Sequence, residues 1–299
     1  MDETRKNSWL TKADCADCPD CHLWLLRNFQ RILPLFDTAV SILDASYYIG
    51  FLAIGVTFVI ITSGIDLSIG TVMMCSAIIG GVLHTKLGWP LWLSLLAILV
   101  IGGVFGLFNG ILIAKFGLPP FIATLGTMMI SRGLSSIVSN VQSVTFPLRG
   151  TGEGWYKDLF RTKENFPTGL IVLIIIAIIA AIVLNKTKIG RYIFAIGSNK
   201  EATRLSGVNV IKWEAMAYVI SGLFAGLAGI AYAATYSTIL PGTGNGMELD
   251  AIAGVVVGGT SLAGGVGSVL GTIIGVFIMS VLKIGLPYID LQPHYQLFI

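Results

Sequence analysis

The sequence predicts an all-α membrane protein, a polytopic transmembrane helical bundle that contains broken or re-entrant helices. Of its 299 residues 55% are hydrophobic and only 12% are charged, with a mean hydropathy of +0.83. A soluble domain of this length needs a larger charged shell. About 20 apolar residues form one helical crossing, and the period-two alternation of a transmembrane barrel is absent. Asp, Glu, Lys, Arg and His are all missing from 90–114, 167–184, 215–247 and 251–282.

The N-terminal part, residues 1–44, is expected to differ from the transmembrane domain at 45–299. Residues 1–22 are polar and predict a loosely held tail. Residues 23–44 carry four charges among apolar side chains, which favours an interfacial amphipathic helix over a membrane span.

A group of three cysteines lies in the tail. Cys15, Cys18 and Cys21 precede His22 at a spacing that suits a metal ion or a c-type haem. No second ligand cluster accompanies them. Incidental thiols are therefore the favoured interpretation, and neither a metal nor another cofactor is expected.

The remaining elements follow from the apolar runs. Residues 46–83 are apolar except for Asp66, which predicts two short crossings that meet at a polar break. A shorter apolar helix is expected at about 249–262. Full spans are expected at about 91–114, 120–139, 167–184, 213–234 and 266–286.

Two polar loops, 140–166 and 185–212, separate these spans. The second contains six Lys or Arg residues against one acidic residue, which places it in the cytoplasm by the positive-inside rule. A short helix is expected there from Asn199 to Leu205, with Gly207 as its C-terminal stop. A basic helix at the membrane surface suits docking on a soluble partner, and an ordinary solvated connector is the alternative.

Polar residues at membrane depth are costly, and this makes them candidates for function. Asp66 is predicted either to contact a hydroxyl-rich or cationic solute at a broken helix or to cap the helix that follows. Glu248 and Asp250 lie near a helix N-terminus, where capping is the favoured role and solute contact the alternative. Arg132 must face the bundle interior, pair with a carboxylate or snorkel, and a structural role is favoured.

Glycines recur every fourth residue in two of the predicted spans. Each series lines one helix face and predicts close helix packing rather than a transport path. The two series are Gly102, Gly106 and Gly110, and Gly267, Gly271 and Gly275.

Several function classes find no support in the sequence. It lacks a G-x-x-x-x-G-K-[ST] phosphate loop, and no metal-ligand set or Ser/His/Asp grouping lies in the spans. The formal charge of +3 does not indicate nucleic-acid binding. The chain is therefore not expected to be an enzyme.

Four ordered motifs resemble those of the ribose/xylose/galactose-type ABC transporter permeases. The resemblance covers about 48–298. The motifs are SGIDLSIG at 63–70, FIATLGTMMISRGL at 121–134, GRYIFAIGSNKEATRLSGVNV at 190–210, and ELDAIAGVVVGGTSLAGGVGSVLGTIIG at 248–275.

The resemblance implies a permease subunit in the bacterial inner membrane that passes a pentose, a hexose or a similar solute. It implies three partners, namely a second permease subunit in a homodimer, a periplasmic sugar-binding protein and a cytoplasmic ATPase with two cassettes. The family fold resembles that of the vitamin B12 importer permease. The residues expected to line the solute path are Asp66, Ser68, Asn109, Thr124, Glu248 and Asp250.

The resemblance also implies that residues 190–210 are the coupling segment, which sits in a cleft of the ATPase. Replacement of residues near Asn199 and Glu201 is expected to uncouple transport. The segment's expected functional residues are Gly190, Arg191, Gly197, Asn199, Glu201, Ala202, Arg204 and Gly207.

The sequence departs from the family pattern at both ends. The family has a spanning helix before the segment at Ser46 and another after the end of the match, where this chain is charged or stops. A truncated, non-transporting paralogue is therefore one alternative. An ion-coupled secondary transporter or channel is another, and it predicts ionisable residues that face one another at the bilayer midplane.

Overall fold

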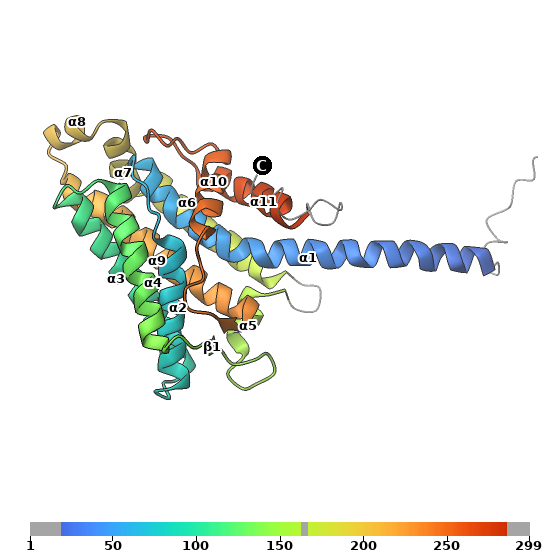
Figure 1. Ribbon diagram of the computed structural model, residues 1–299. Helices are drawn as coiled ribbons and strands as arrows, with labels where there is room; N and C mark the ends of the chain where they lie inside the picture. The colour runs from blue at the N-terminus through green and yellow to red at the C-terminus, as the bar shows by residue number, and fades with distance from the viewer. Residues whose placement is uncertain (1–18, 163–166, 286–299) are drawn as a thin grey trace, which may run out of the picture.

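The computed structural model describes residues 19–162 and 167–285, with side chains described for 39–162 and 167–283. This part of the chain is mostly helical (Figure 1). The two-residue strands β1 (Val144–Thr145) and β2 (Thr238–Ile239) pair antiparallel. The helices are α1 (Pro19–Ile61), α2 (Ile69–Thr85), α3 (Leu91–Ala114), α4 (Pro120–Ser139), α5 (Trp155–Phe160), α6 (Thr168–Lys186), α7 (Lys188–Ser198), α8 (Lys200–Leu205), α9 (Val210–Tyr236), α10 (Met247–Val257) and α11 (Val269–Gly285).

The helices form a multi-pass membrane protein, as the composition predicts. Among the described residues, five helical stretches are long and apolar enough to cross a bilayer: residues 39–61 of α1 and the whole of α3, α4, α6 and α9. Helix α2 and most of α11 are shorter apolar helices. The predicted spans at 91–114 and 120–139 coincide with α3 and α4.

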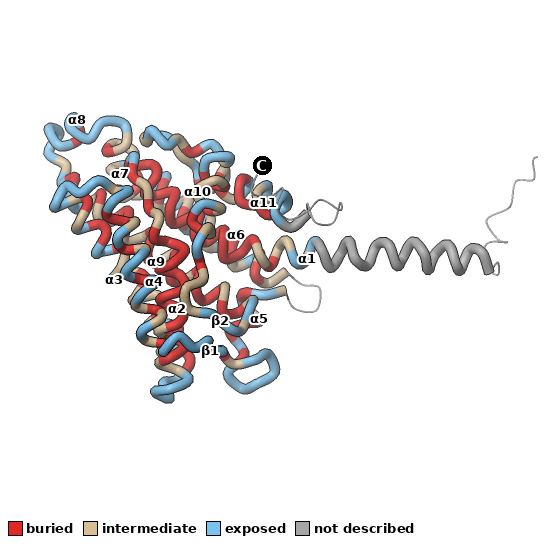
Figure 2. Tube along the Cα trace, viewed as in Figure 1, coloured by how far each residue is buried: buried red, intermediate tan, exposed pale blue. Residues whose placement is uncertain are grey.

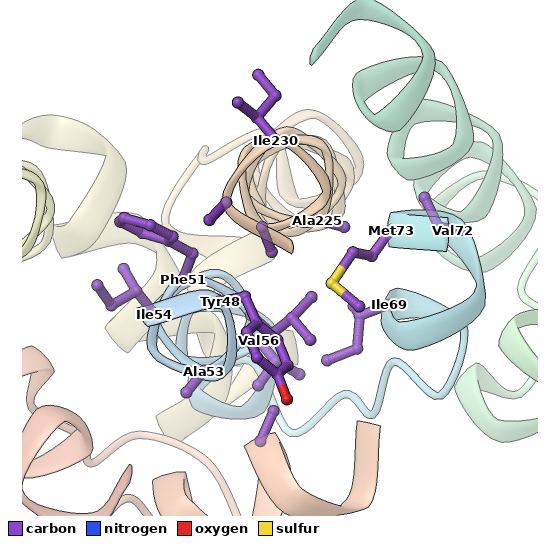
Figure 3. Packing of buried hydrophobic residues seen from close by; sticks show 14 of the residues in the cluster. Tyr48, Phe51, Ala53, Ile54, Val56, Ile69, Val72, Met73, Ala225 and Ile230 are labelled. Carbon is purple, nitrogen blue, oxygen red and sulfur yellow. The ribbon is translucent and has the colours of Figure 1, made fainter. Parts of the chain in front are cut away.

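The core surrounds the C-terminal half of α1. From Tyr47 to Ile61 this helix is buried along its whole circumference, with Phe51 and Ile54 fully inaccessible. It packs against α2, α9, α10 and α11 (Figure 3). Figure 2 shows the buried residues concentrated where these helices meet. A helix that is apolar all round is stable only when it is enclosed, so α1 is the central helix of the bundle.

The glycine series mark close helix contacts, as predicted, except that Gly267 lies before the start of α11. A Cβ added to Gly102 would lie 2.3 Å from the carbonyl oxygen of Gly222, and one added to Gly106 would lie 2.2 Å from that of Tyr218. Helices α3 and α9 therefore meet backbone to backbone. In the same way α11 meets the end of α10, where a Cβ on Gly275 would lie 1.9 Å from the Gly254 oxygen.

Three predicted elements need correction. Residues 23–44 are not a separate helix, because α1 runs without a break from Pro19 to Ile61, and an interfacial position for them stays a prediction. Residues 188–198 form helix α7 rather than a loop. The apolar helix expected at 249–262 begins at Met247 and ends at Val257. Residues 1–18 lie outside the described part, as do the side chains of the cysteine group.

The two ends of the bundle differ in composition. Helices α7 and α8 lie at one end, whereas α5 and the β1–β2 pair lie at the other (Figure 1). Exposed basic residues gather at the α7–α8 end, among them Arg191, Lys200 and Arg204. The bundle thus presents two chemically distinct surfaces outside its spans.

Candidate functional site

The chain between α1 and α2 is the predicted polar break, and Asp66 lies fully buried within it at 1% exposure. One carboxylate oxygen accepts hydrogen bonds from the Ser68 amide (3.0 Å) and the Ser68 hydroxyl (2.6 Å). The other accepts from the Ser221 hydroxyl of α9 (3.0 Å). Ser68 itself occupies the N-cap position of α2, so Asp66 contributes to this helix end only by accepting from the Ser68 amide.

Further hydrogen bonds extend from Ser68 to two more helices. The Asn109 side-chain amide on α3 donates to the Ser68 hydroxyl (2.9 Å), and the Thr127 hydroxyl on α4 donates to the Asn109 oxygen (2.5 Å). We call Asp66, Ser68, Asn109, Thr127 and Ser221 the Asp66 cluster. Each member is at most 1% exposed. The cluster thus links the break to α3, α4 and α9.

Sequence reasoning identified three of the five members and missed Thr127 and Ser221. Both lie on helix faces that are otherwise lined by small residues. A hydroxyl on such a face becomes informative only when the opposing helix is known. Thr124, which was expected on the path, is buried one turn away, but its hydroxyl donates to the Pro120 carbonyl of its own helix (2.8 Å).

The two acidic residues of α10 have separate partners. Glu248 is buried, and one of its oxygens accepts from the Gly246 amide at the helix N-terminus (3.0 Å), which fits the predicted capping role. Its second oxygen has no hydrogen-bond partner among the described residues and faces Gly70 at the start of α2. Asp250 pairs with Lys283 of α11. Neither residue joins the Asp66 cluster.

In this conformation the Asp66 cluster is closed to a solute. Its carboxylate and amide oxygens are occupied by partners within the chain, and it lies out of contact with solvent. Buried polar groups that are satisfied in this way fix the packing of the helices that carry them. Contact between the cluster and a solute therefore requires the break to open, and the path-lining role of Asp66, Ser68, Asn109 and Thr124 stays a prediction.

The segment 188–209 contains the short helix that the sequence predicts. Helix α8 begins after Asn199, whose side chain accepts from the Ala202 amide (2.9 Å), and ends before Gly207, which adopts a φ of +82°. A positive φ favours glycine, which explains the stop. Most residues of the segment 188–209 are exposed, including Arg191, Glu201 and Arg204. A hollow of about 610 Å³ separates α7 from α8.

An ion pair fixes α8 to the start of α9. The Lys200 ammonium lies 2.8 Å from a carboxylate oxygen of Glu214, which is only 6% exposed. The exposed pair of Arg204 and Glu201 lies within α8 itself and adds little to stability. Because the Glu214 carboxylate is buried, the Lys200 pair is the stronger restraint on the position of α8.

Three backbone segments meet behind α7 at a point where no side chain fits. A Cβ added to Gly197 would lie 1.8 Å from the carbonyl oxygen of Ile61, the last residue of α1, and 2.5 Å from the amide nitrogen of Gly265. The Gly265 amide donates to that same Ile61 oxygen (2.9 Å). Ser63 donates to the carbonyl of Ala263 (2.8 Å). We call Ile61, Ser63, Gly197, Ala263 and Gly265 the Gly197 junction.

Gly190, the remaining glycine predicted to be functional, is required by a close backbone contact. A Cβ at this position would lie 1.7 Å from the Leu184 carbonyl oxygen, because α7 turns back sharply against the end of α6. The exposed segment is therefore held by backbone contacts on both sides of α7. Helix α7 is thus in direct contact with the end of α1, five residues before Asp66.

The comparisons with known proteins agree with this architecture. The family model for the permease component of the branched-chain amino acid transport system matches residues 38–299. No solved structure matches the chain, so the resemblance to the vitamin B12 importer fold stays a prediction.

Curated relatives are import permeases for different sugars. The ribose import permease protein of Escherichia coli is 38% identical over 276 residues, which are 91% of this chain and 83% of that protein. The fructose import permease protein of Bifidobacterium longum is 38% identical over 248 residues, 80% of this chain and 72% of that protein. The galactose/methyl galactoside import permease protein of Haemophilus influenzae is 37% identical over 263 residues, 83% of this chain and 78% of that protein. The chain therefore belongs to the sugar-import branch of the ATP-binding cassette permease family, as its motifs indicate.

Proposed function

We propose that the chain is the membrane-spanning permease subunit of an ATP-driven importer for a monosaccharide or a similar hydroxyl-rich solute. The observation that carries this proposal is the Gly197 junction. It connects an exposed segment at one end of the bundle, mainly by backbone contacts, to the break that contains Asp66. Such a connection suits a subunit that is moved from outside by a separate motor protein.

The exposed segment is proposed to face the cytoplasm. Lysine and arginine outnumber acidic residues there, and Lys115 follows α3 at the same end. Five apolar helices, α1, α2, α3, α4 and α6, are taken as crossings before this segment, and the six-residue α5 is not counted. An odd number of crossings places the start of the first span on the opposite, periplasmic side.

Three partners complete the proposed importer. A cytoplasmic ATPase with two cassettes receives α7 and α8, and ATP binding moves them. A periplasmic sugar-binding protein delivers the solute at the α5 end and supplies most of the affinity. A second permease subunit, in a homodimer, forms the other wall of the path.

The test is reconstitution of the permease, its ATPase and its binding protein in liposomes. We expect uptake of labelled ribose, fructose or galactose that depends on ATP. Uptake driven by an ion gradient in the absence of the ATPase would contradict the proposal and favour the secondary transporter.

A pair of exposed leucines tests the docking surface. Leu205 of α8 is 82% exposed, and Leu148 at the opposite end is 58% exposed. We expect Leu205→Asp to reduce co-purification of the ATPase at least tenfold, because it places a charge on the proposed contact surface. Leu148→Asp is the matched control and should retain the ATPase. Equal retention by both variants would show that α8 does not carry the contact.

A further inference from the structure

The outward faces of α3, α4 and α6 differ in the polarity of their exposed residues, and the proposed function does not explain this difference. The exposed residues of α6 include Ile171, Ile175, Ile178 and Ile182, and those of α3 are similarly apolar. Such faces suit contact with lipid chains. Helix α4 exposes apolar residues too, but Arg132 stands among them, directly before the exposed Gly133.

Arg132 lies well inside its span. It is 12 positions after Pro120 and 7 positions before Ser139, which corresponds to about 18 Å and 10 Å along the helix at 1.5 Å per residue. The guanidinium makes no hydrogen bond and no ion pair with any described residue. A charge at such a depth in lipid costs about 3 kcal/mol or more. Arg132 therefore needs either water or a partner beyond the described residues.

The neighbouring surface favours water. The chain between β2 and α10 passes beside Arg132, since a Cβ added to Gly242 would lie 4.0 Å from the Arg132 Nε atom. This connection carries Thr243 and the exposed Asn245, and it ends at the N-terminus of α10. Arg132 and the connection thus form a polar strip on the outward face of α4, whereas the exposed side chains of α6 from Ile171 to Ile182 are apolar.

We propose that Arg132 lines the water-filled path of the solute and donates hydrogen bonds from its guanidinium to solute hydroxyls. This inference rests on the proposed function, because the opposite wall of the path comes from the second permease subunit. A guanidinium has five N–H donors in a fixed plane, which suits the closely spaced oxygens of a sugar. With the Asp66 cluster closed, Arg132 is a polar group that a solute meets before the break opens.

Thiol labelling tests whether water reaches this position. Arg132→Cys is placed in a chain whose native cysteines are replaced by alanine, and the complete importer is treated in liposomes with a charged, membrane-impermeant methanethiosulfonate. The matched control is Ile175→Cys, because Ile175 lies 7 positions from the α6 end that faces the same side and is 52% exposed. We expect Arg132→Cys to react at least tenfold faster. Equal and slow reaction of both variants would place Arg132 in lipid and overturn the inference.

Uptake measurements test the contact with solute. We expect Arg132→Gln, which retains a polar side chain, to reduce ATP-dependent sugar uptake at least tenfold while the ATPase still co-purifies. Unimpaired uptake by Arg132→Gln would overturn the role in solute contact, whatever the labelling result. Absence of ATP-dependent uptake by the unaltered chain would instead refute the proposed function, so the two failures are distinguishable.

Discussion

The Asp66 cluster and the Gly197 junction hold the two ends of the same break in different ways. Side-chain hydrogen bonds between four elements form the cluster, and they can exchange one partner for another. The junction consists mainly of backbone atoms in contact, and even one methyl group has no room there. The difference indicates a division of labour. We expect the junction to transmit displacement as a rigid contact and the cluster to be the part that opens.

Gly197→Ala breaks the rigid side of this comparison and should have the largest effect. The new Cβ would lie 1.8 Å from a backbone oxygen, so α7 must move away from the end of α1. We expect a loss of more than about 3 kcal/mol in the free energy of unfolding. Thermal unfolding of the detergent-solubilised protein measures this loss. If the protein folds, ATP hydrolysis should continue without uptake. Unchanged stability and uptake would show that the junction can accommodate a methyl group without displacing α7.

Asp66→Ala removes the acceptor at the centre of the cluster. The Ser68 amide and the Ser221 hydroxyl then lose their buried partner, which costs about 2 to 3 kcal/mol. Asp66→Asn keeps an acceptor oxygen and should lose about half as much. Thermal unfolding of the two variants side by side measures the difference. A larger loss for Asn than for Ala would contradict the hydrogen-bond arrangement described here.

Asn109→Ala removes one link between the cluster and its outer members. It leaves Asp66 satisfied but separates Thr127 on α4 from Ser68. We expect a loss of about 1 to 2 kcal/mol in the free energy of unfolding. In Asn109→Ala we expect ATP hydrolysis and sugar uptake to fall together, whereas in Gly197→Ala hydrolysis continues without uptake. Hydrolysis that continues without transport in Asn109→Ala would remove the distinction between the two regions.

Gly126→Ala is the smallest expected change and the control for Gly197→Ala. Gly126 lies in α4, and a Cβ added there meets no atom within 4 Å. Because alanine is a better helix former, the free energy of unfolding should rise slightly or stay within about 0.5 kcal/mol. A large loss measured in detergent would mean that a second subunit already covers this face under the conditions of the measurement.

The sequence predicts the spans of this fold well and its contacts poorly. Spans α3 and α4 follow directly from their apolar lengths, and the Asn199 cap and the Gly207 stop are local signals. The continuity of α1 was missed because the charges at 23–44 resemble an interfacial helix, although charged residues also continue a helix beyond the membrane. Helix α7 was missed because Gly190 and Gly197 resemble loop glycines, whereas packing against Leu184 and Ile61 requires them.

The candidate site divides in the same way. Asp66 and Asn109 attract attention because charged and amide side chains are rare in apolar runs. Ser221 and Thr127 do not, since hydroxyls are common in membrane helices and often donate to their own backbone. Their roles depend on which helix faces them, and that is a property of the packed bundle.

The backbone contact between α3 and α9 has a consequence for how the cluster opens. Gly102 and Gly222 are reciprocal, because a Cβ on either would lie within 2.3 Å of the carbonyl oxygen of the other. We therefore expect the two helices to move as one piece during a transport cycle. Asn109 on α3 and Ser221 on α9 would then keep a constant separation. We expect Asp66 and Ser68 to be the groups that move out from between them.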